Sequence, residues 1–425
     1  KMNKLPPGHA LELDCNDFNL NIWKYWHPPK LQNNCNPSKD YNMATKTKEL
    51  ECLLSNSVKK QLVSDVPIGI LLSGGVDSSL ITALASRHKK NIKTFTVAFP
   101  NNQKYNESEY ARLISKEFCT EHIELEAKNI NPRDLLPCLA KQYDEPIIDS
   151  SMIPTFMITK LVKEHCTVVL GGDGGDELFG GYNHYSRLLW SQKKTKYIPS
   201  ILKKPIAHIA EKFLPMGTKG KIWLQSLEFD LNKELPLIAS YFDKLNRKKL
   251  INDNNWPLVS EKIRKDRVFK THSLLERATR TDFNNYLAED ILVKTDRASM
   301  LNSLELRAPF LSNKIIEFAF ELNSSMKTSQ FEKKIILQEL CKNVLPSKFI
   351  SNRKQGFAIP LNEWLKDGIW LDYFKEVLLD YENNLFNLKY LEKLFISQKK
   401  GYQLGERIYS LVMFKLWLRE YNIKI

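Results

Sequence analysis

The stretch of residues 67–79 constrains the fold of this chain more than any other part of the sequence. Residues 68–72 form a short apolar run, which is long enough for one buried strand. Residues 73–75, Ser-Gly-Gly, end this run, and from Ser78 onward apolar side chains return at helical spacing. The sequence therefore predicts a strand, a glycine turn and the N-terminus of a helix, in that order.

This turn combines three features of a phosphate-binding site. Its glycines allow the backbone to approach a ligand closely, and the free N–H groups and dipole of the following helix favour an anion. The hydroxyls of Ser73, Ser78 and Ser79 add hydrogen-bond donors. Asp77 could hold a cation against the same phosphates. We therefore expect a site for pyrophosphate; the alternative is a polar turn without a ligand.

The turn differs from the P-loop of many nucleotide-binding proteins. The sequence contains no G-x-x-x-x-G-K-[ST] motif, so γ-phosphoryl transfer of that kind is not expected. The stretch instead resembles the S-G-G-x-D-S loop of the ATP pyrophosphatase superfamily. This resemblance implies that ATP is cleaved between its α and β phosphates in order to adenylate a substrate.

The composition is that of a soluble globular protein. Hydrophobic residues make up 43% and charged residues 26% of the 425 positions. No apolar run approaches the roughly 18 residues that cross a bilayer. The seven cysteines are odd in number and form no C-x-x-C pair, which argues against a disulfide framework or a zinc site. We expect a protein of the reducing cytoplasm, without a membrane partner.

The net charge of +14 could indicate a nucleic-acid partner. However, the basic residues are spread widely, and aromatic residues are not interleaved with them as base-stacking surfaces require. We interpret the lysines as solvated faces and expect no nucleic-acid partner.

Before and after the turn, predicted strands alternate with predicted helices. The strands cover residues 93–99, 121–126 and 166–170, and the helices cover residues 45–63, 106–118, 131–142 and 154–164. Asn106 is expected to cap the helix that it begins. This alternation predicts an α/β fold with a doubly wound, mostly parallel sheet, followed by additional C-terminal helices. Ligands bind beyond the carboxyl ends of such strands, so we expect the site in the loops after Leu72, Phe99 and Leu170.

Two regions give little functional information. Residues 1–45 contain one strand-like run, Ala10–Leu13, followed by a segment around Trp23 that we expect to be irregular. We interpret these residues as a linker or the tail of an upstream domain. Residues 191–271 are rich in lysine and asparagine with helical patches, and we assign them no role.

A second group of polar residues follows the predicted strand 166–170. Between Gly171 and Gly181 the sequence has three carboxylates, Asp173, Asp176 and Glu177, among six glycines. Like charges this close raise each other's pKa unless a cation compensates, and Mg²⁺ bound to ATP takes one or two protein carboxylates. We therefore expect a site for Mg²⁺ and ATP; the alternatives are a calcium-type loop and an acidic surface turn.

The two loops, S-G-G-V-D-S-S and G-G-D-G-G-D-E-L-F-G-G-Y, together resemble the synthetase domain of the glutamine-hydrolysing asparagine synthetases. Further segments agree with that family in the same order, namely 144–154, 290–300, 305–311, 333–337 and 353–357. The similarity covers roughly residues 46–370. The opening residues 4–9 are similar to the last strand of the family's glutaminase domain. The resemblance implies a remnant of that domain and a linker at residues 1–45 and an ATP pyrophosphatase domain at residues 46–425.

The resemblance also implies roles for individual residues. The pyrophosphate part of ATP would be held by Ser73, Gly74, Gly75, Asp77, Ser78 and Ser79. The adenosine and α-phosphate would be held by Leu71, Val97, Gly171 and Gly172. The metal ligands would be Asp77 and Asp176. Asp173 would accept a proton from attacking ammonia, and Lys334 would stabilise charge at the α-phosphate. Further candidates for substrate binding are Ser150, Ser151, Glu177 and Arg307.

Two of these residues have a plain structural alternative. Lys334 could be a lysine on a helix surface, because Lys333 precedes it directly. Arg307 could be an ion-pair partner that supports the fold. The catalytic N-terminal cysteine of the family's glutaminase half has no counterpart in this sequence.

The implied reaction is ATP-dependent amide formation with Mg²⁺. The β-carboxylate of aspartate would attack the α-phosphorus to give an acyl-adenylate and pyrophosphate. Ammonia, derived from glutamine in the full-length protein, would then displace AMP and give asparagine. The partners implied are these small molecules and an upstream glutaminase domain, and a homodimer is possible.

The sequence departs from the family's pattern at three positions. Gly171 replaces a residue that is commonly Ser, and Ser312 replaces one that is commonly Asp. Phe331-Glu332 stands where the family usually has Gly. These departures leave open a related enzyme that acts on another carboxylate, in polysaccharide, peptide or antibiotic biosynthesis. Two further alternatives are a non-catalytic nucleotide-binding protein and a tRNA-modifying pyrophosphatase, although the latter would need cysteines near the nucleotide.

Overall fold

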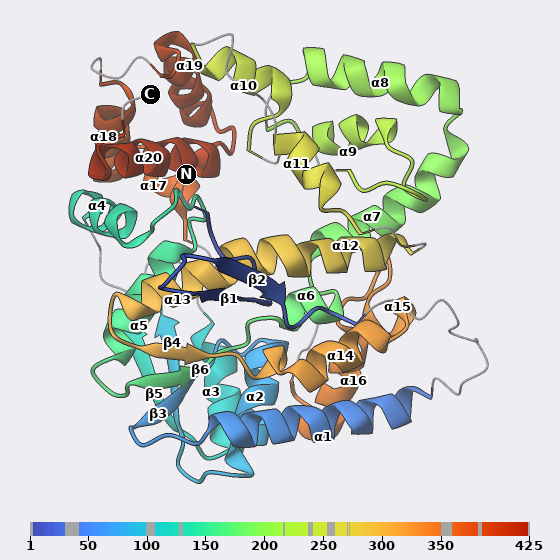
Figure 1. Ribbon diagram of the computed structural model, residues 1–425, viewed down its shortest axis with the longest axis vertical. Coiled ribbons are helices and arrows are strands. Elements are labelled where there is room, and N and C mark those ends of the chain that lie inside the picture. Colours follow the sequence, from blue (N-terminus) through green and yellow to red (C-terminus); the bar gives the residue numbers. More distant parts are fainter. Residues whose placement is uncertain are drawn as a thin grey trace.

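The structure is a computed structural model (Figure 1). It describes residues 3–29, 42–98, 107–126, 131–215, 217–236, 241–252, 260–269, 271, 273–349, 359–380 and 385–423. The predicted strand end at Phe99, the predicted cap Asn106 and the segment 353–357 lie outside the described residues.

A five-stranded sheet forms the centre of the chain, in the order β5-β4-β3-β6-β7. Its strands are β3 (Ile68–Leu71), β4 (Lys93–Ala98), β5 (Glu121–Glu126), β6 (Val168–Leu170) and β7 (Glu305–Arg307). Every neighbouring pair is parallel, which confirms the predicted fold class. The sequence predicted the first four strands; the fifth, of three residues, was not expected as a strand.

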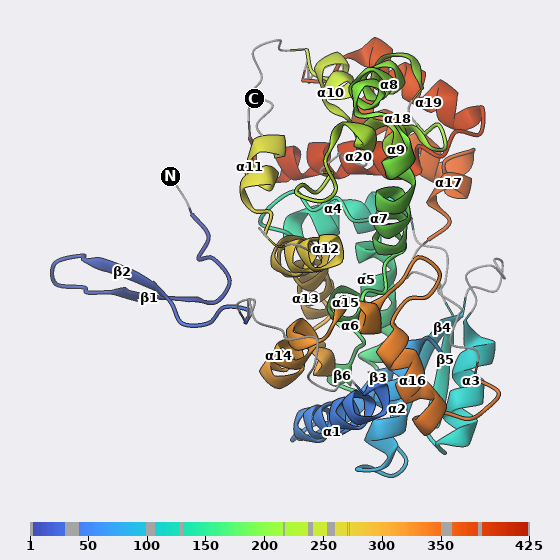
Figure 2. The same ribbon diagram turned by 90° about the vertical axis from the view of Figure 1, so that its right-hand side faces the viewer.

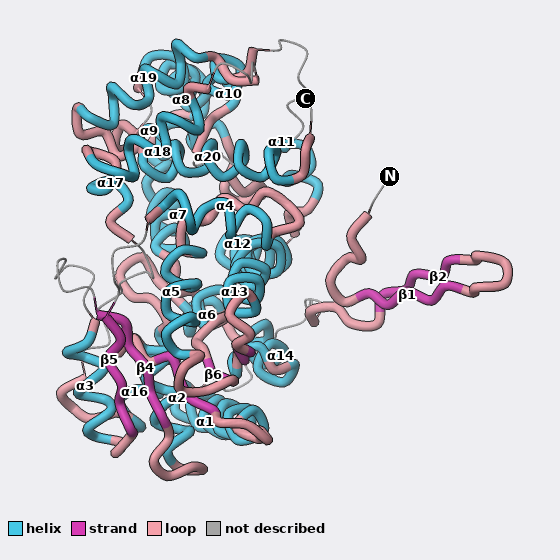
Figure 3. Tube along the Cα trace, turned by 90° about the vertical axis from the view of Figure 1, so that its left-hand side faces the viewer, coloured by secondary structure: helices cyan, strands magenta, loops and turns pink. Residues whose placement is uncertain are grey.

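Helices cover both faces of this sheet (Figure 1; Figure 3 shows the strands in magenta). One face packs against α1 (Met43–Gln61), α2 (Val76–Ser86), α3 (Ser108–Glu117) and α16 (Ile335–Val344), and the other against α5 (Met152–Val162) and α13 (Leu292–Met300). Successive strand side chains alternate between the faces. Leu170 packs with α1 and α2, whereas its neighbour Val169 packs with Val162 of α5. The doubly wound arrangement is therefore confirmed.

Local sequence explains why the predicted helices form. Leu50, Leu54 and Val58 of α1 recur every four residues and are fully buried. Helix α4 (Pro132–Gln142) begins at a cap, because the side chain of Asn131 accepts a hydrogen bond from the N–H of Arg133.

The C-terminal helices pack together as a separate layer, drawn in red and orange at the upper left of Figure 1. They are α17 (Leu361–Trp364), α18 (Gly368–Leu378), α19 (Leu388–Lys399) and α20 (Gly405–Glu420). Together with α4 they enclose a second core that includes Phe374, Ile408 and Tyr409. The additional C-terminal helices expected from the sequence are therefore confirmed. No helix in the described residues is long and apolar enough to span a membrane.

A long, mostly helical segment connects β6 to β7. Its elements are α6 (Gly175–Phe179), α7 (Asn183–Lys194), η2 (Thr195–Tyr197), α8 (Ser200–Phe213), α9 (Lys221–Gln225), η3 (Ser226–Glu228), α10 (Lys244–Leu250), α11 (Ser260–Asp266), α12 (Leu274–Asp282) and the π-helix η4 (Phe283–Ile291). After β7 come η5 (Pro309–Leu311), α14 (Asn313–Glu321) and α15 (Ser324–Lys327). The region 191–271, for which no role was predicted, lies within this connection.

The N-terminal residues form a hairpin that projects away from the rest of the chain (Figure 2). Its strands β1 (His9–Leu13) and β2 (Leu20–Lys24) pair antiparallel. The expectation of an irregular segment around Trp23 was wrong, because Trp23 pairs with Ala10 in this hairpin. Apolar side chains on it stay open to solvent, with 76% of Phe18 and 69% of Tyr25 exposed.

Candidate active site

The two glycine-rich loops meet at the centre of the sheet. The first follows β3 and the second follows β6, and these strands are adjacent and parallel. From β3 the chain proceeds outward to β4 and β5, and it then returns to β6 and β7 on the other side. The strand order therefore reverses between β3 and β6, which is the point where open α/β sheets bind ligands.

The first loop is closed by hydrogen bonds between its serines. The backbone N–H of Ser73 donates to Oγ of Ser78 at 3.2 Å, and the two hydroxyls lie 3.0 Å apart. The N–H of Gly75 donates to Oγ of Ser73 at 3.3 Å. Gly74 has φ +72°, and an added Cβ would lie 2.8 Å from the carbonyl carbon of Tyr110. Helix α2 starts directly after this turn, so its N-terminus faces the loop as predicted.

The other candidate nucleotide residues lie at the ends of neighbouring strands. Leu71 ends β3, and Val97 is the residue before the last of β4. Gly171 follows β6, and its N–H donates to the carbonyl of Arg307 at 2.8 Å. Ser79 differs from the rest because its side chain is fully buried, and its Oγ has no hydrogen-bond partner among the described residues.

The ammonium of Lys334 bridges the two loops. It donates to Oδ2 of Asp77 in the first turn of α2 and, at 2.7 Å, to Oδ1 of Asp176 in α6. Only 8% of Lys334 is exposed. Burial lowers the pKa of Lys334, but the charges of Asp176 and Asp77 outweigh this effect and hold its pKa above the ordinary value. A permanent positive charge therefore lies between two carboxylates that face each other.

The backbone at Lys334 has an uncommon conformation. Its φ of +53° is left-handed, and it precedes α16 as the N-cap residue. The turn before it is held by Thr328, whose Oγ1 donates to the carbonyl of Glu332 at 2.8 Å. This turn carries the Phe331-Glu332 pair that departs from the family's usual Gly. Since Lys334 is buried between two acids, the surface-helix alternative does not describe it.

Glycines allow this close approach of charged groups. A Cβ at Gly175 would lie 2.7 Å from Oδ1 of Asp77, and a Cβ at Gly172 would lie 2.9 Å from Cβ of Asp77. A Cβ at Gly181 would lie 2.8 Å from Cγ of Asp176. Any larger residue at these positions would displace the carboxylates.

The carboxylate of Asp173 lies in the same loop. Burial raises its pKa, Lys294 acts to lower it, and the charges of Asp77 and Asp176 raise it further. The net shift is upward. A carboxylate with a raised pKa is a better proton acceptor than an ordinary aspartate.

The carboxylates of Asp77 and Asp176 are candidate ligands for a metal ion. Among the described residues, no group of three or more His, Cys, Asp or Glu side chains is arranged to hold a metal ion by itself. The ammonium of Lys334 contacts both Asp77 and Asp176, however, so these two carboxylates are close enough to share one cation. Mg²⁺ takes one or two protein carboxylates and completes its shell with phosphates and water. The pair therefore fits a Mg²⁺ ion that arrives with ATP.

A second polar group surrounds Asp149, between β5 and β6 in the sequence. The ammonium of Lys294 donates to Oδ2 of Asp149 at 3.0 Å and to Oγ of Ser151 at 2.7 Å. The N–H and Oγ of Ser151 both donate to Oδ1 of Asp149. Burial acts to raise the pKa of Asp149, but Lys294 and Ser151 outweigh it and lower the pKa. The adjacent Ser150 donates to Oε1 of Glu406 at 2.9 Å.

The last two candidates have clear partners. Glu177 is buried and accepts a hydrogen bond from the hydroxyl of Tyr182 at 2.5 Å, and burial raises the pKa of Glu177 to about 7. Arg307 donates to Oε1 of Glu305 and, at 2.7 Å, to the carbonyls of Gln61 and Val63. These contacts tie β7 to the end of α1, in agreement with the structural alternative for Arg307.

Sequence reasoning missed two charged residues of this site, Asp149 and Lys294. Both lie inside segments that resemble the family, but nothing in the sequence indicated that they contact each other across 145 positions. The contact between Lys294 and Asp149 could have been proposed only once the sheet topology was known.

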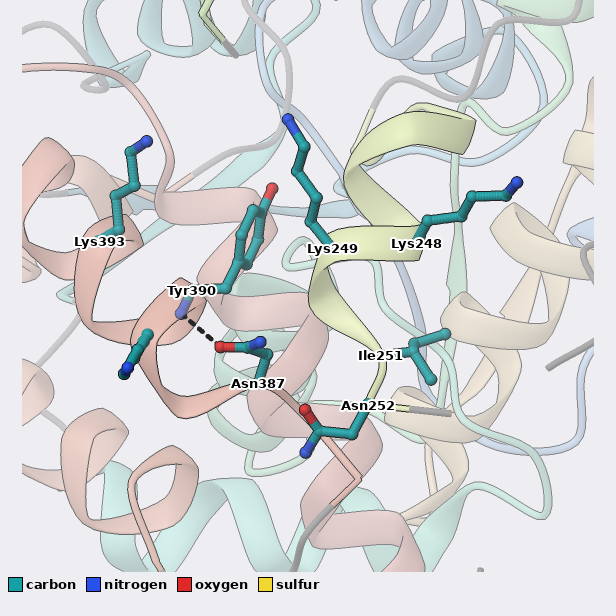
Figure 4. A pocket seen from close by; sticks show the side chains of 8 residues that line it. Lys248, Lys249, Ile251, Asn252, Asn387, Tyr390 and Lys393 are labelled. Carbon is teal, nitrogen blue, oxygen red and sulfur yellow. Dashed lines mark hydrogen bonds between the residues drawn. The ribbon is translucent and has the colours of Figure 1, made fainter. Parts of the chain in front are cut away.

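A separate pocket of about 410 Å³ lies between α10 and α19 (Figure 4). Lys248, Lys249, Lys389 and Lys393 line it together with Tyr390. In Figure 4 the side chains of Lys249 and Lys393 extend on either side of Tyr390. The N–H of Tyr390 donates to Oδ1 of Asn387, which caps α19. None of the candidate residues above lines this pocket.

Comparison with known proteins agrees with this geometry. The model of the asparagine synthase family matches residues 49–419. The chain is 31% identical over 379 residues to asparagine synthetase (glutamine-hydrolyzing) 1 of Bacillus subtilis, a match that covers 87% of this chain and 58% of that protein. It is 26% identical to asparagine synthetase 3 of the same organism, over 100% of this chain and 67% of that protein. A putative asparagine synthetase of Methanocaldococcus jannaschii is 29% identical over 72% of this chain and 58% of its own length.

One solved structure, an NH3-dependent NAD synthetase from Campylobacter jejuni, is similar with a TM-score of 0.22 and 20% identity, over 33% of this chain and 60% of that one. The chain spans less than two thirds of the length of the first Bacillus relative. The family model, in contrast, extends over most of the chain, from α1 to α20. The chain belongs to the asparagine synthase family.

Proposed function

We propose that this chain adenylates the side-chain carboxylate of aspartate with ATP and transfers ammonia to it, giving asparagine, AMP and pyrophosphate. Membership of the family implies the use of ATP. The observation that carries the proposal is the contact of Lys334 with both Asp77 and Asp176 at the switch point of the sheet. It supports a site in which a fixed cation and a pair of acids handle a triphosphate.

The first loop would hold the phosphates that leave. Backbone N–H groups of residues 73–75 and the hydroxyls of Ser73 and Ser78 are donors at the N-terminus of α2, where the helix dipole favours an anion. Leu71, Val97, Gly171 and Gly172 would contact the adenosine and the α-phosphate, since they lie at the adjoining strand ends.

In the first step an oxygen of the aspartate β-carboxylate attacks the α-phosphorus. The bond from this phosphorus to the bridging oxygen breaks, and pyrophosphate leaves with the electron pair. Lys334 would stabilise the negative charge that develops on the α-phosphate, because its ammonium is fixed before the reaction. Asp77 and Asp176 would hold Mg²⁺, which when bound neutralises charge on the phosphates.

In the second step the nitrogen of ammonia attacks the carbonyl carbon of the mixed anhydride. The bond from this carbon to the phosphate oxygen breaks, and AMP leaves with the electron pair. The surplus proton on nitrogen would pass to Asp173, whose raised pKa suits a proton acceptor.

The source of ammonia would be a glutaminase domain that precedes residue 46. The exposed apolar side chains of the N-terminal hairpin support this proposal, because isolated hairpins are rarely stable in water and these side chains would gain from being covered. A homodimer and a location in the cytoplasm remain predictions.

A pyrophosphate-release assay tests the proposed reaction. The chain would be incubated with ATP, Mg²⁺ and ammonium and with each of a panel of carboxylic acids, and the amide product would be identified by mass. Release with aspartate together with new asparagine is the expected result. Release only with another acid would indicate a related amide synthetase, and no release with any acid would favour a non-catalytic nucleotide-binding protein.

A further inference from the structure

Two opposite charges lie about one turn apart where η4 passes into α13. Asp290 is the residue before the last of the π-helix, and Lys294 lies in the first turn of the following α-helix. Side chains at this spacing are neighbours on a helix surface, with about 5–6 Å between their Cβ atoms. π-helical turns are uncommon and occur often at functional sites.

Lys294 keeps one donor for another group. A lysine ammonium has three N–H donors. Two of them are used, toward Oδ2 of Asp149 and Oγ of Ser151, at 3.0 and 2.7 Å. These contacts fix the buried side chain and, within the part of the chain that the structure describes, leave one N–H for an acceptor.

One carboxylate oxygen of Asp290 lacks a hydrogen-bond donor among the described residues. Its Oδ1 is buried and accepts no hydrogen bond from the described residues. Burial and the charge of Asp149 raise the pKa of Asp290 to about 7, although the charge of Lys294 acts to lower it. A buried carboxylate oxygen without a donor is costly, so this oxygen would gain from a donor or cation supplied by a ligand.

Both side chains are close to the proposed reaction site. The charge of Lys294 acts on Asp173. Tyr286, on the same π-helix as Asp290, packs edge-on against Tyr182 with ring centroids 5.8 Å apart. Tyr182 in turn bonds Glu177 in the second glycine-rich loop. The π-helix that carries Asp290 therefore contacts, through Tyr286, the loop that carries Asp173.

We propose that Asp290 and Lys294 recognise the ammonium and carboxylate groups of an α-amino acid, so that only its side-chain carboxylate reaches the ATP. The proposal rests on the proposed function and names the class of acceptor. An α-amino acid carries a positive and a negative group on one carbon. These groups match the opposite charges of Asp290 and Lys294, which lie about one helical turn apart. A dicarboxylic acid without the amine would leave Asp290 unpaired, and an amine without the second carboxylate would leave the free N–H of Lys294 unused.

Two simpler acids allow the contacts of Asp290 and Lys294 to be tested one at a time. Succinate is aspartate without the amine, and β-alanine is aspartate without the α-carboxylate. Both would be compared with aspartate in the pyrophosphate-release assay, as substrates or as competitive inhibitors. For the unchanged chain we expect kcat/KM to be about 10- to 100-fold higher for aspartate than for either acid, since each acid lacks one charged hydrogen bond. If the acids only inhibit, their Ki should exceed the KM of aspartate by the same factor.

The variants should show opposite patterns. Asp290→Asn should lower kcat/KM, or raise Ki, by about 10- to 100-fold for aspartate and β-alanine. For succinate the same constant should change less than about threefold. Lys294→Met should impair the use or binding of aspartate and succinate by a similar factor and leave that of β-alanine unchanged. Asp296→Asn, an exposed position on the same helix, and Lys314→Met, exposed on α14, are the matched controls and should change none of the three. Thermal unfolding and ATP affinity are measured in parallel, and the near-isosteric Asp290→Asn carries the test if Lys294→Met does not fold.

The outcomes distinguish this inference from the function on which it rests. Equal losses for all three acids, or equal use of them by the unchanged chain, would overturn the recognition of an α-amino acid but leave amide formation in place. Absence of pyrophosphate release with every acid would overturn the proposed function and this inference with it.

Discussion

Lys334 and Asp77 are 257 positions apart in the chain, yet the ammonium of the first donates to the carboxylate of the second. The same ammonium lies 2.7 Å from Asp176. Three segments therefore contribute to one charged centre: the start of α2, the start of α6 and the residue before α16. The proposed reaction depends on this centre.

Removing the cation should impair both activity and stability. Lys334→Met leaves two carboxylates that face each other in a mostly buried site, which should cost about 3–5 kcal/mol of unfolding free energy. Pyrophosphate release should fall by at least about 100-fold, because a fixed charge toward the α-phosphate is lost. Urea unfolding and the release assay measure the two effects.

The neighbouring Lys333 provides the control for this variant. It is half-buried, and its ammonium donates to Oδ1 of Asn183 at 2.6 Å. Lys333→Met should keep activity within about threefold and stability within about 0.5 kcal/mol. Added Mg²⁺ should raise the melting temperature of Lys334→Met more than that of the unchanged chain. A Lys334→Met variant with normal release would show that this lysine does not act on the phosphates.

Asp77→Asn should abolish pyrophosphate release. The amide cannot pair with Lys334 as a carboxylate does and is a poor ligand for Mg²⁺. Asp176→Asn should instead raise the Mg²⁺ concentration that half-saturates activity, which a titration at fixed ATP measures. The exposed Asp65→Asn, just before β3, serves as the control. Near-normal activity of Asp77→Asn would defeat the metal assignment.

Gly175→Ala should displace the carboxylate of Asp77. The new methyl carbon would lie 2.7 Å from Oδ1 of Asp77, so this side chain must move, and release should fall by about 100-fold. Gly405→Ala is a closely matched control. It also begins a helix, and its Cβ would lie 2.8 Å from Oδ1 of Asn362, far from the charged centre in the sequence. If both variants lost activity equally, the effect would be one of folding.

The buried Lys327 in α15 should make stability depend on pH. Burial lowers its pKa from 10.5 to about 7, with Glu276 acting to raise it and Arg280 to lower it. The unfolded chain then binds this proton more tightly, so the contribution of Lys327 to the unfolding free energy rises with pH from about 7 to 10.5.

Lys327→Met should remove this slope and stabilise the chain by roughly 1–4 kcal/mol at pH 7, since the ring of Phe320, at 5.4 Å, already provides an apolar neighbour. Urea unfolding from pH 7 to 10 compares the variant with the unchanged chain, and Lys314→Met is the exposed control. Parallel pH profiles for Lys327→Met and the unchanged chain would show that Lys327 keeps an ordinary pKa.

Local patterns predicted the fold well because β3, β4 and β6 are buried on both faces and β5 alternates between buried and exposed residues. The run 68–72 and the alternation at Glu121–Glu126 identified β3 and β5 directly. The hairpin strand at Leu20–Lys24 was missed, because its residues are exposed and show no apolar alternation. The sheet order that makes β3 and β6 neighbours could not come from local patterns, since it is set by packing.

The site was predictable only in part for the same reason. Glycines and acids near Asp77 and Asp176 indicated phosphate and metal chemistry from local sequence alone. Lys334 came only from resemblance, and its left-handed backbone and its two acid partners depend on tertiary contacts. The contact of Lys294 with Asp149 joins two elements far apart in the sequence, so no pattern could indicate it.

Isotope transfer tests the central claim of adenylation most directly. The chain would be incubated with aspartate labelled with oxygen-18 in its side-chain carboxylate, together with ATP, Mg²⁺ and ammonium, and the products would be analysed by mass spectrometry. If the carboxylate attacks the α-phosphorus, one labelled oxygen appears in AMP for each asparagine formed, and pyrophosphate stays unlabelled. Label in inorganic phosphate with release of ADP, or unlabelled AMP, would contradict the account.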